Sequence, residues 1–575
     1  MKSNRTIKNR PLRRFWGLLS QDRKEIQSVY FLSIFNGLVN LSLPLGIQSI
    51  VSFIQTGQIT TSWIVLLLLV VLGIVITGIL QIYQLRITEN LQQRVFTRAA
   101  FEFAFRVPRI KMESMYQKYG PELMNRFFDT LSVQKGLPKL LIDFSTAAMQ
   151  ITFGLLLLCF YHPFFIFFTF ALIVTVLVII RFTASKGLDT SINESTFKYQ
   201  MAHWLQEVAR TATSFKLAGN TDLQLNRTDE LVKQYLGARN SHFRILVQQY
   251  SLMIVFKVVI AAGLLGIGGY LVIKQQMNIG QFVASEILIL LIISSIEKLI
   301  LCIETIYDVL TGLEKIGQVT DLELDNLGGI SITHADYPDG LPVELNDVSF
   351  KYPNDNTILF KQLDLNIEPG AKILITGTDG SGKSTLLHLL AGLYDIESGS
   401  INYGGISRTN YDTRALHSVI GDCITTEKIF PGTLLENITM GRPNATLDNV
   451  KWAIENLGMS KYINKLPNGL NTLLDNHGKS LPQSIAIKLI LARSIADRPK
   501  LLLIEDMLEL LQEKEMMEVI NFLTKKENKW TLVSISSDII CASTMDYVVE
   551  LKDGFLHKLS PKELEQRKIK EGSYA

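Results

Sequence analysis

The sequence predicts a multi-domain membrane protein in which an all-α domain of six membrane-spanning helices is followed by an α/β domain. Three observations support this. The 575 residues have a mean hydropathy of +0.22 with only 19% charged residues. The first half holds six long apolar runs, and the second half alternates short β-branched runs with helical patterns. We expect a basic segment at 1–25, the helical domain at 26–320, a linker at 321–340 and the α/β domain at 341–575.

The six apolar runs reach or approach the roughly 20 residues that a helix needs to cross a membrane. They are 29–54, 63–84, 147–161, 163–180, 252–273 and 280–301. The third and fourth runs are separated at His162 and Pro163, where proline disfavours helix in the residue before it. We therefore expect a hairpin turn there, and six spans in all.

The distribution of basic residues predicts how these spans are oriented. The loops after the first and third runs hold no lysine or arginine, and the loop before the sixth holds only Lys274. Segments 86–139 and 181–249 are long, basic and helical in composition. Because basic loops stay in the cytoplasm, these segments, the N-terminus and the α/β domain should be cytoplasmic.

Composition argues against several other classes of protein. The net charge of +3 gives no reason to expect a nucleic-acid partner. The four cysteines are widely spaced, which argues against both a disulfide framework and a metal site. The first apolar run is too long for the core of a cleaved signal peptide, so we expect it to be retained.

A phosphate-binding motif is the sharpest local signal. It fits GxxxxGK(S/T) and comprises Gly377, Thr378, Asp379, Gly380, Ser381, Gly382, Lys383, Ser384 and Thr385. It follows an apolar strand pattern and begins a helix, as a P-loop does. Backbone N–H groups would surround phosphates, Lys383 would reach the terminal phosphates and Ser384 would bind Mg²⁺. The alternative, a glycine-rich turn with a chance lysine, explains this setting less well.

Six spans, cytoplasmic helical extensions and then a P-loop domain resemble the half-transporters of the ABC exporter family over nearly the whole chain. The segments NLSLPLGIQ at 40–48 and NIGQF at 278–282 resemble haemolysin-type, type I secretion exporters. The resemblance implies an exporter fold of type I, ATP and Mg²⁺ as ligands, and a place in the inner membrane. It also implies a homodimer or a heterodimer with a second half-transporter, together with a periplasmic adaptor and an outer-membrane channel.

The resemblance assigns roles to further residues, and several depart from the family pattern. Tyr352 would stack on adenine, although a tyrosine in this setting, taken alone, is more often a half-buried core or edge residue. Glu505 and Asp506 stand where the family has Asp then Glu, so Glu505 would hold Mg²⁺ and Asp506 would be a weak catalytic acid. The glutamine-loop, signature and switch positions hold Thr425, Leu481, Pro482, Gln483, Ser484, Ile485 and Ser537. These replacements predict ATP binding with slow hydrolysis; the alternative is drift within a working family.

Charged residues inside the spans are candidates for a substrate path, because they are costly in lipid. Lys257 and Glu286 are the two candidates, whereas Glu297, Lys298 and Glu304 are expected at the cytoplasmic end, where their side chains can reach water. Two functions remain open from sequence. One is an exporter subunit for a peptide, protein or hydrophobic compound, and the other is an ATP-sensing membrane scaffold that does not transport.

Overall fold

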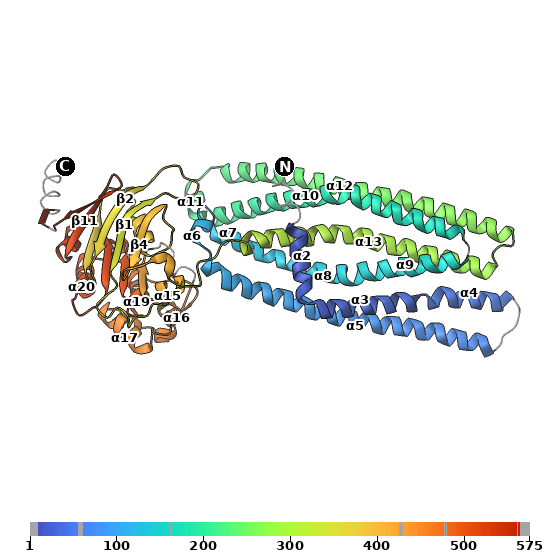
Figure 1. Ribbon diagram of the computed structural model, residues 1–575, viewed down its shortest axis with the longest axis horizontal. Helices are drawn as coiled ribbons and strands as arrows, with labels where there is room; N and C mark the ends of the chain where they lie inside the picture. Colours follow the sequence, from blue (N-terminus) through green and yellow to red (C-terminus); the bar gives the residue numbers. More distant parts are fainter. Residues whose placement is uncertain are drawn as a thin grey trace. The chain divides into compact units, whose positions relative to one another are not determined.

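The computed structural model describes residues 10–55, 61–161, 163–424, 429–475, 478, 480–560 and 562–563. The chain forms two compact units. The helical unit comprises Met1–Pro108 and Lys118–Leu322, and the sheet unit comprises Arg109–Gln117 and Glu323–Ala575. An all-α unit and an α/β unit confirm the predicted fold class (Figure 1).

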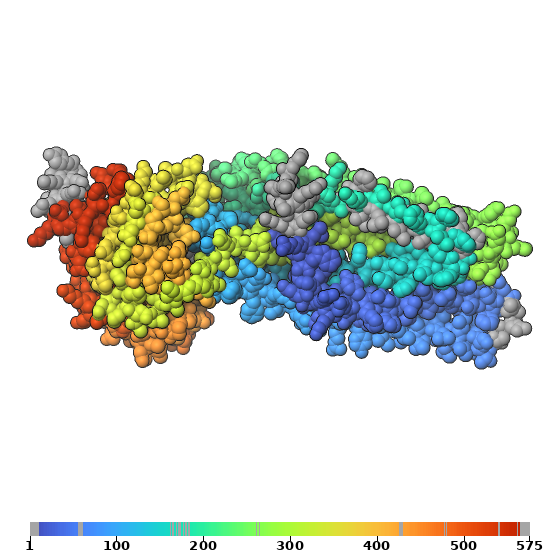
Figure 2. Space-filling view, in the orientation of Figure 1, coloured from blue at the N-terminus to red at the C-terminus, as the bar shows by residue number. Residues whose placement is uncertain are grey.

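The helical unit is built of helices that range from 5 to 51 residues in length. In chain order they are α2 (Arg10–Gln21), α3 (Arg23–Asn40), α4 (Ser42–Gln55), α5 (Thr61–Arg106), α7 (Gly120–Met124), α8 (Asp129–Pro138), α9 (Phe144–Tyr161), α10 (Phe164–Arg210), α11 (Ala212–Leu217), α12 (Leu223–Ile273) and α13 (Ile279–Thr320). Figure 2 shows α3 and α4, in darker blue, one after the other along α5, in lighter blue.

The apolar runs explain these helices. Within the part of the chain that the structure describes, four stretches are long and apolar enough to cross a membrane: Arg23–Gln55, Thr61–Arg109, Gly120–Tyr161 and Leu223–Ile273. The predicted runs 163–180 and 280–301 lie in α10 and α13. Leu68, Leu69 and Ile82 of α5 are exposed, as expected of side chains that face lipid.

Polar contacts join the helices inside the bundle. The Gln84 side chain donates a 2.8 Å hydrogen bond to the Ser33 hydroxyl, which lies 2.7 Å from the Ser145 hydroxyl, and all three residues are buried. α13 packs against α4, α8, α9, α10 and α12. It begins with a capping box, in which Asn278 and Gln281 each bond the other's backbone N–H. α13 is therefore the helix around which the unit is packed.

The sheet unit contains two main sheets. The larger has the order β12-β11-β3-β10-β9-β6, and its strands are parallel except for β12. The smaller is antiparallel with the order β2-β1-β4-β5. A third pair joins β7 to β8. The β-branched and leucine-rich strands are buried because helices cover the parallel sheet.

The strands are β1 (Val343–Phe350), β2 (Phe360–Ile367), β3 (Lys372–Thr376), β4 (Ser398–Tyr403), β5 (Ile406–Ser407), β6 (Ile420–Cys423), β7 (Gly432–Thr433), β8 (Leu473–Leu474), β9 (Leu501–Ile504), β10 (Thr531–Ile535), β11 (Tyr547–Lys552) and β12 (Phe555–Leu559). The helices are α14 (Lys383–Leu390), α15 (Thr413–Ser418), α16 (Leu434–Thr439), α17 (Leu447–Asn456), α18 (Ser460–Ile463), α19 (Gln483–Ile495), α20 (Glu513–Leu523) and α21 (Ile539–Ser543).

One short segment from the first half of the chain belongs to the sheet unit. Residues 109–117, with α6 (Met112–Met115), lie within the range that we expected to be the helical domain. Ile110 forms a β-bridge with Leu324. Residues 323–340, most of the expected linker, also belong to the sheet unit, where Ile332 is buried in the core.

Candidate nucleotide-binding site

The predicted phosphate loop lies at the carboxyl edge of the larger sheet. Strand β10 pairs with β3 on one side and β9 on the other, all three parallel. Their ends therefore lie side by side and deliver Gly377, Glu505 and Ser536 to one edge. Ligands of open α/β sheets bind at this edge.

Glycines give the loop its curled backbone. Gly377, Gly380 and Gly382 have φ of 150°, 78° and 101°, a range that other residues rarely adopt. A Cβ on Gly377 would lie 2.4 Å from the carbonyl oxygen of Leu551. The loop therefore requires glycine at this position for space as well as for conformation.

Lys383 is held against the loop. Its ammonium group donates hydrogen bonds to the carbonyl oxygens of Gly377 at 2.8 Å and Thr378 at 3.1 Å, and lies 3.7 Å from the Asp379 carboxylate. The Ser381 hydroxyl oxygen is buried and has no hydrogen-bond partner among the described residues. A buried donor without a partner next to a lysine fits an anion such as a phosphate. Ser384 is exposed in the first turn of α14, where it could bind Mg²⁺.

Tyr352 is fixed near the phosphate loop. Its hydroxyl lies 2.8 Å from the Thr385 hydroxyl, and its ring is half-buried. The rings of Phe350 and Tyr394 meet it nearly at right angles, with centroids 5.1 and 5.5 Å away. One face is stacked on Tyr116, with centroids 4.8 Å apart and 11° between planes. Tyr116 was not among the residues predicted from sequence.

The two acids follow strand β9. Glu505 is half-buried at the strand end and Asp506 is exposed beside it. Partial burial, followed by the Glu509 and Glu505 carboxylates, raises the pKa of Asp506, against the opposing charge of Lys383. Asp506 thus follows a strand whose end lies at the same edge of the sheet as the phosphate loop.

A third acid, Glu509, forms hydrogen bonds at this edge of the sheet. Its carboxylate accepts hydrogen bonds from the Ser536 hydroxyl at 2.7 Å, and from the Ser537 backbone N–H at 2.8 Å and hydroxyl at 3.2 Å. Ser537 occupies the predicted switch position. The segment after β10 is therefore bound to the segment after β9, and sequence spacing alone gives no signal for that contact.

The predicted signature residues lie at the start of α19. Pro482 is the N-cap residue and makes no side-chain cap bond, and Gln483 begins the helix. Leu481, Ser484 and Ile485 are half-buried beside them. Pro482 has no N–H to donate, which weakens this helix start as an anion site. Thr425 lies outside the described residues.

The two charged candidates in the helical unit, Lys257 and Glu286, lie in different surroundings. Lys257 of α12 forms an ion pair with Glu297 of α13, and both side chains are partly exposed. Glu286 is half-buried seven residues after the start of α13. The structure thus joins Lys257 to an acid that we had expected merely to reach water.

Comparisons with known proteins agree with this architecture. The family described as the ABC transporter transmembrane region matches residues 28–296, and the ABC transporter family matches residues 360–508. The transport/processing ATP-binding protein ComA of Streptococcus pneumoniae is 22% identical over 560 residues, 94% of this chain and 75% of that protein. The α-hemolysin translocation ATP-binding protein HlyB of Escherichia coli is 24% identical over 328 residues, 56% of this chain and 46% of HlyB.

One sequence match spans a small part of the relative. A 34% identical stretch of 165 residues is 28% of this chain but 13% of ABC transporter B family member 21 of Arabidopsis thaliana. A solved structure of a bacterial Atm1-family ABC exporter with ATP bound has the same fold, with a TM-score of 0.82 at 18% identity over 95% of this chain and 96% of that one. The chain belongs to the ABC transporter family and has the fold of an exporter half-transporter, a multi-pass helical domain fused to a nucleotide-binding domain.

Proposed function

We propose that this chain is an export subunit that binds ATP with Mg²⁺. It would couple closure of nucleotide-binding domains to export of a peptide, protein or hydrophobic compound across the inner membrane, with slow hydrolysis. The observation that supports this most strongly is the phosphate loop. The Lys383 ammonium group is hydrogen-bonded to this loop, and the buried Ser381 hydroxyl has no partner among the described residues. The same chain contains helices long and apolar enough to cross a membrane.

Each residue of the site has a role in this proposal. The loop N–H groups, Ser381 and Lys383 bind phosphate oxygens, and the Tyr352 ring binds the base. Ser384 and Glu505 hold Mg²⁺. Asp506 is the remaining acid for the attacking water, but its side chain is one methylene shorter than glutamate. A misplacement of about 1 Å can cost on the order of a hundredfold in rate, so hydrolysis is slow.

Partners follow from how the family uses its sites. In an ABC dimer each ATP lies between the phosphate loop of one subunit and the signature of the other. A homodimer of this chain would pair two replaced signatures with two weak acids. A second, complete half-transporter would leave neither site whole, because each site would still contain the replaced residues that this chain contributes to it. The haemolysin-type resemblance adds a periplasmic adaptor and an outer-membrane channel as candidate partners.

A second candidate is an ATP-sensing scaffold that does not transport. The contact of Glu509 with Ser536 and Ser537 favours it, because it holds the switch segment through a carboxylate rather than leaving it for the γ-phosphate. This candidate shares ATP binding with the first. The two differ in whether ATP changes the membrane-spanning helices.

ATP turnover in lipid nanodiscs tests the hydrolysis part of the proposal. We expect little phosphate release by the full chain, and no nucleotide binding by Lys383→Ala. A brisk rate that Lys383→Ala abolishes would contradict slow hydrolysis. Nucleotide binding that survives Lys383→Ala would contradict the assigned site.

Distances between spin labels separate exporter from scaffold. Gln55 ends α4, and Gln276 lies between α12 and α13, both exposed. Labels at Gln55→Cys and Gln276→Cys report on the ends of the spans within one chain. An exporter subunit predicts a distance change when a non-hydrolysable ATP analogue is added, and none with Lys383→Ala. Equal distances with and without the analogue would favour the scaffold.

A further inference from the structure

The segment 109–117 is bound firmly to the sheet unit by its backbone. The Ile110–Leu324 bridge is flanked by two hydrogen bonds. The N–H of Lys111 donates to the carbonyl of Glu323 at 2.9 Å, and the N–H of Asp325 donates to the carbonyl of Arg109 at 2.8 Å. The chain from α5 thus pairs with residues more than 200 positions later.

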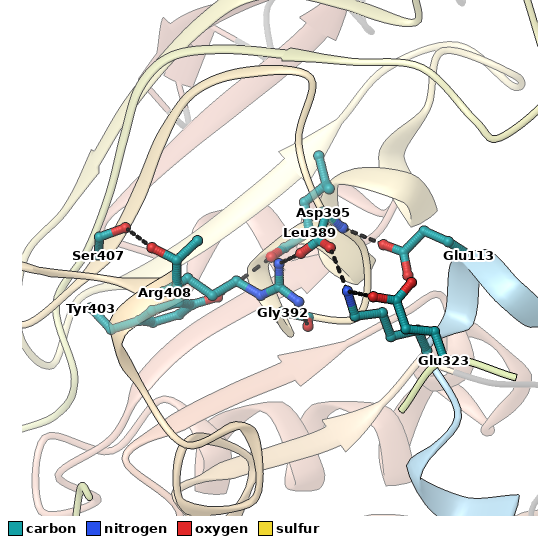
Figure 3. Close-up of polar contacts among 10 residues, drawn as sticks. Glu113, Glu323, Leu389, Gly392, Asp395, Tyr403, Ser407 and Arg408 are labelled. Atoms are coloured by element: carbon teal, nitrogen blue, oxygen red, sulfur yellow. Dashed lines mark hydrogen bonds and ion pairs between the residues drawn. The ribbon is translucent and has the colours of Figure 1, made fainter. Parts of the chain in front are cut away.

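Charged side chains fix the next part of the segment (Figure 3). The Glu113 carboxylate accepts from the backbone N–H of Asp395. Lys111 lies 3.2 Å from the Glu323 carboxylate and 3.5 Å from that of Asp395, and Arg408 pairs with Asp395. Burial alone would raise the pKa of Asp395, but Arg408 and Lys111 hold it below its usual value. The cluster therefore keeps Asp395 charged and the start of α6 in place.

Tyr116 follows the last residue of α6, so these anchors also set where its ring lies. The ring is nearly parallel to Tyr352, at 11° and 4.8 Å. Tyr352 also contacts the Thr385 hydroxyl and the rings of Phe350 and Tyr394. Tyr352 is therefore held in one orientation by groups from the segment, the smaller sheet and the phosphate-loop helix.

We propose that Tyr116 is a positioning residue for the nucleotide base. It stacks on one face of Tyr352 and holds the ring so that a purine stacks on the opposite face, giving a three-layer stack of Tyr116, Tyr352 and base. This inference rests on the proposed ATP binding. A ring that is already oriented loses less freedom when the base binds, which raises affinity.

The arrangement also couples binding of the base to the position of segment 109–117. Tyr116 lies on a stretch that continues directly into the helical unit at both ends. Because coupling between two sites is reciprocal, any preference of the bound base for the stacked arrangement stabilises the segment equally.

Binding of two probes to the full chain in nanodiscs tests the inference. The probes are AMP-PNP, which has a base, and inorganic tripolyphosphate, which has none. Tyr116→Ala should weaken AMP-PNP binding by about three- to tenfold, the range of an aromatic stack, and leave tripolyphosphate binding unchanged. Tyr116→Phe should restore AMP-PNP binding because it keeps the ring. Tyr119→Ala, which removes a ring that contacts His203 instead, is the matched control and should bind both probes normally.

The possible results separate the two proposals. Unchanged or tighter AMP-PNP binding by Tyr116→Ala, with binding still lost in Lys383→Ala, would overturn the role of Tyr116 and leave ATP binding intact. Equal weakening of both probes would also overturn it, because it would indicate a general structural defect. Failure of the unsubstituted chain to bind either probe would overturn ATP binding, and this inference with it.

Discussion

Alanine at three glycines of one loop should give three different losses of stability. In Gly380→Ala the new Cβ would have no atom within 4 Å, so the loss in free energy of unfolding comes from backbone strain alone and is about 1–2 kcal/mol. Gly382→Ala has the same kind of strain and places a Cβ 2.9 Å from the buried Phe360 ring, which adds about 1–3 kcal/mol. Gly377→Ala places it 2.4 Å from a backbone oxygen of Leu551 within β11, which cannot rotate away. We expect about 4 kcal/mol or more there.

Thermal unfolding of the full chain can measure this order. For a unit of this size, 1 kcal/mol shifts Tm by about 2–4 °C. Gly380→Ala should therefore lower Tm by about 2–8 °C, and Gly377→Ala by more than about 8 °C. Trp452 and Trp530 contact each other in the core of the sheet unit and report its unfolding by fluorescence. The signal is isolated by phenylalanine at the other tryptophans, Trp16, Trp63 and Trp204.

The order of the three variants is the decisive result. If Gly380→Ala lowered Tm as much as Gly377→Ala, steric contact with β11 would not be the cause of the loss. If all three variants unfolded like the unsubstituted chain, the loop would not have the described backbone. Either result would refute the reasoning from loop geometry.

Three further predictions concern the acids, pH and the helical unit. Exchanging the acids, as Glu505→Asp with Asp506→Glu, should raise phosphate release by less than about tenfold, since the other replaced positions remain; a larger rise would show that acid order alone limits the rate. Burial lowers the pKa of His417 below 6.5, so the unfolded chain takes up a proton first and stability should fall as pH drops through about 6.5. Thermal melts from pH 7.5 to 5.5 check this, and His417→Gln should flatten the slope. Tyr199→Phe removes a 2.5 Å hydrogen bond to the buried Asp129 carboxylate, and should destabilise the helical unit by about 1.5–3 kcal/mol in thermal melts.

Features that depend on neighbouring residues in the chain were predictable from sequence. The helix break at Pro163 is present, since α9 ends at Tyr161 and α10 begins at Phe164. The phosphate loop lies between β3 and α14, as its motif indicated. In both cases a few consecutive residues determine the backbone, so a local pattern is sufficient.

Features that depend on distant pairing were not predictable. The composition of 86–139 indicated a helical extension, and α5 does continue to Arg106, but nothing in that composition shows where the chain enters the sheet unit. The assignment of 109–117 to that unit depends on the bridge between Ile110 and Leu324. The stack of Tyr116 on Tyr352 depends on this bridge in turn. A single sequence does not reveal contacts that form only when both partners are folded.

The same distinction explains how the fold can persist with so many replaced site residues. The strands before the site are buried, with Ile504 and Ile535 each 1% exposed, whereas Asp506 and Ser537 beyond them are exposed. Changing an exposed residue after a strand costs little stability, while alanine at Gly377 costs about 4 kcal/mol or more by the estimate above. Substitution in the phosphate loop therefore lowers the stability of the fold, whereas substitution at Asp506 or Ser537 can change hydrolysis with little effect on stability. On the proposed function, a chain with this loop and weak acids would use ATP mainly as a ligand that stabilises one arrangement, by an amount set by its concentration relative to Kd.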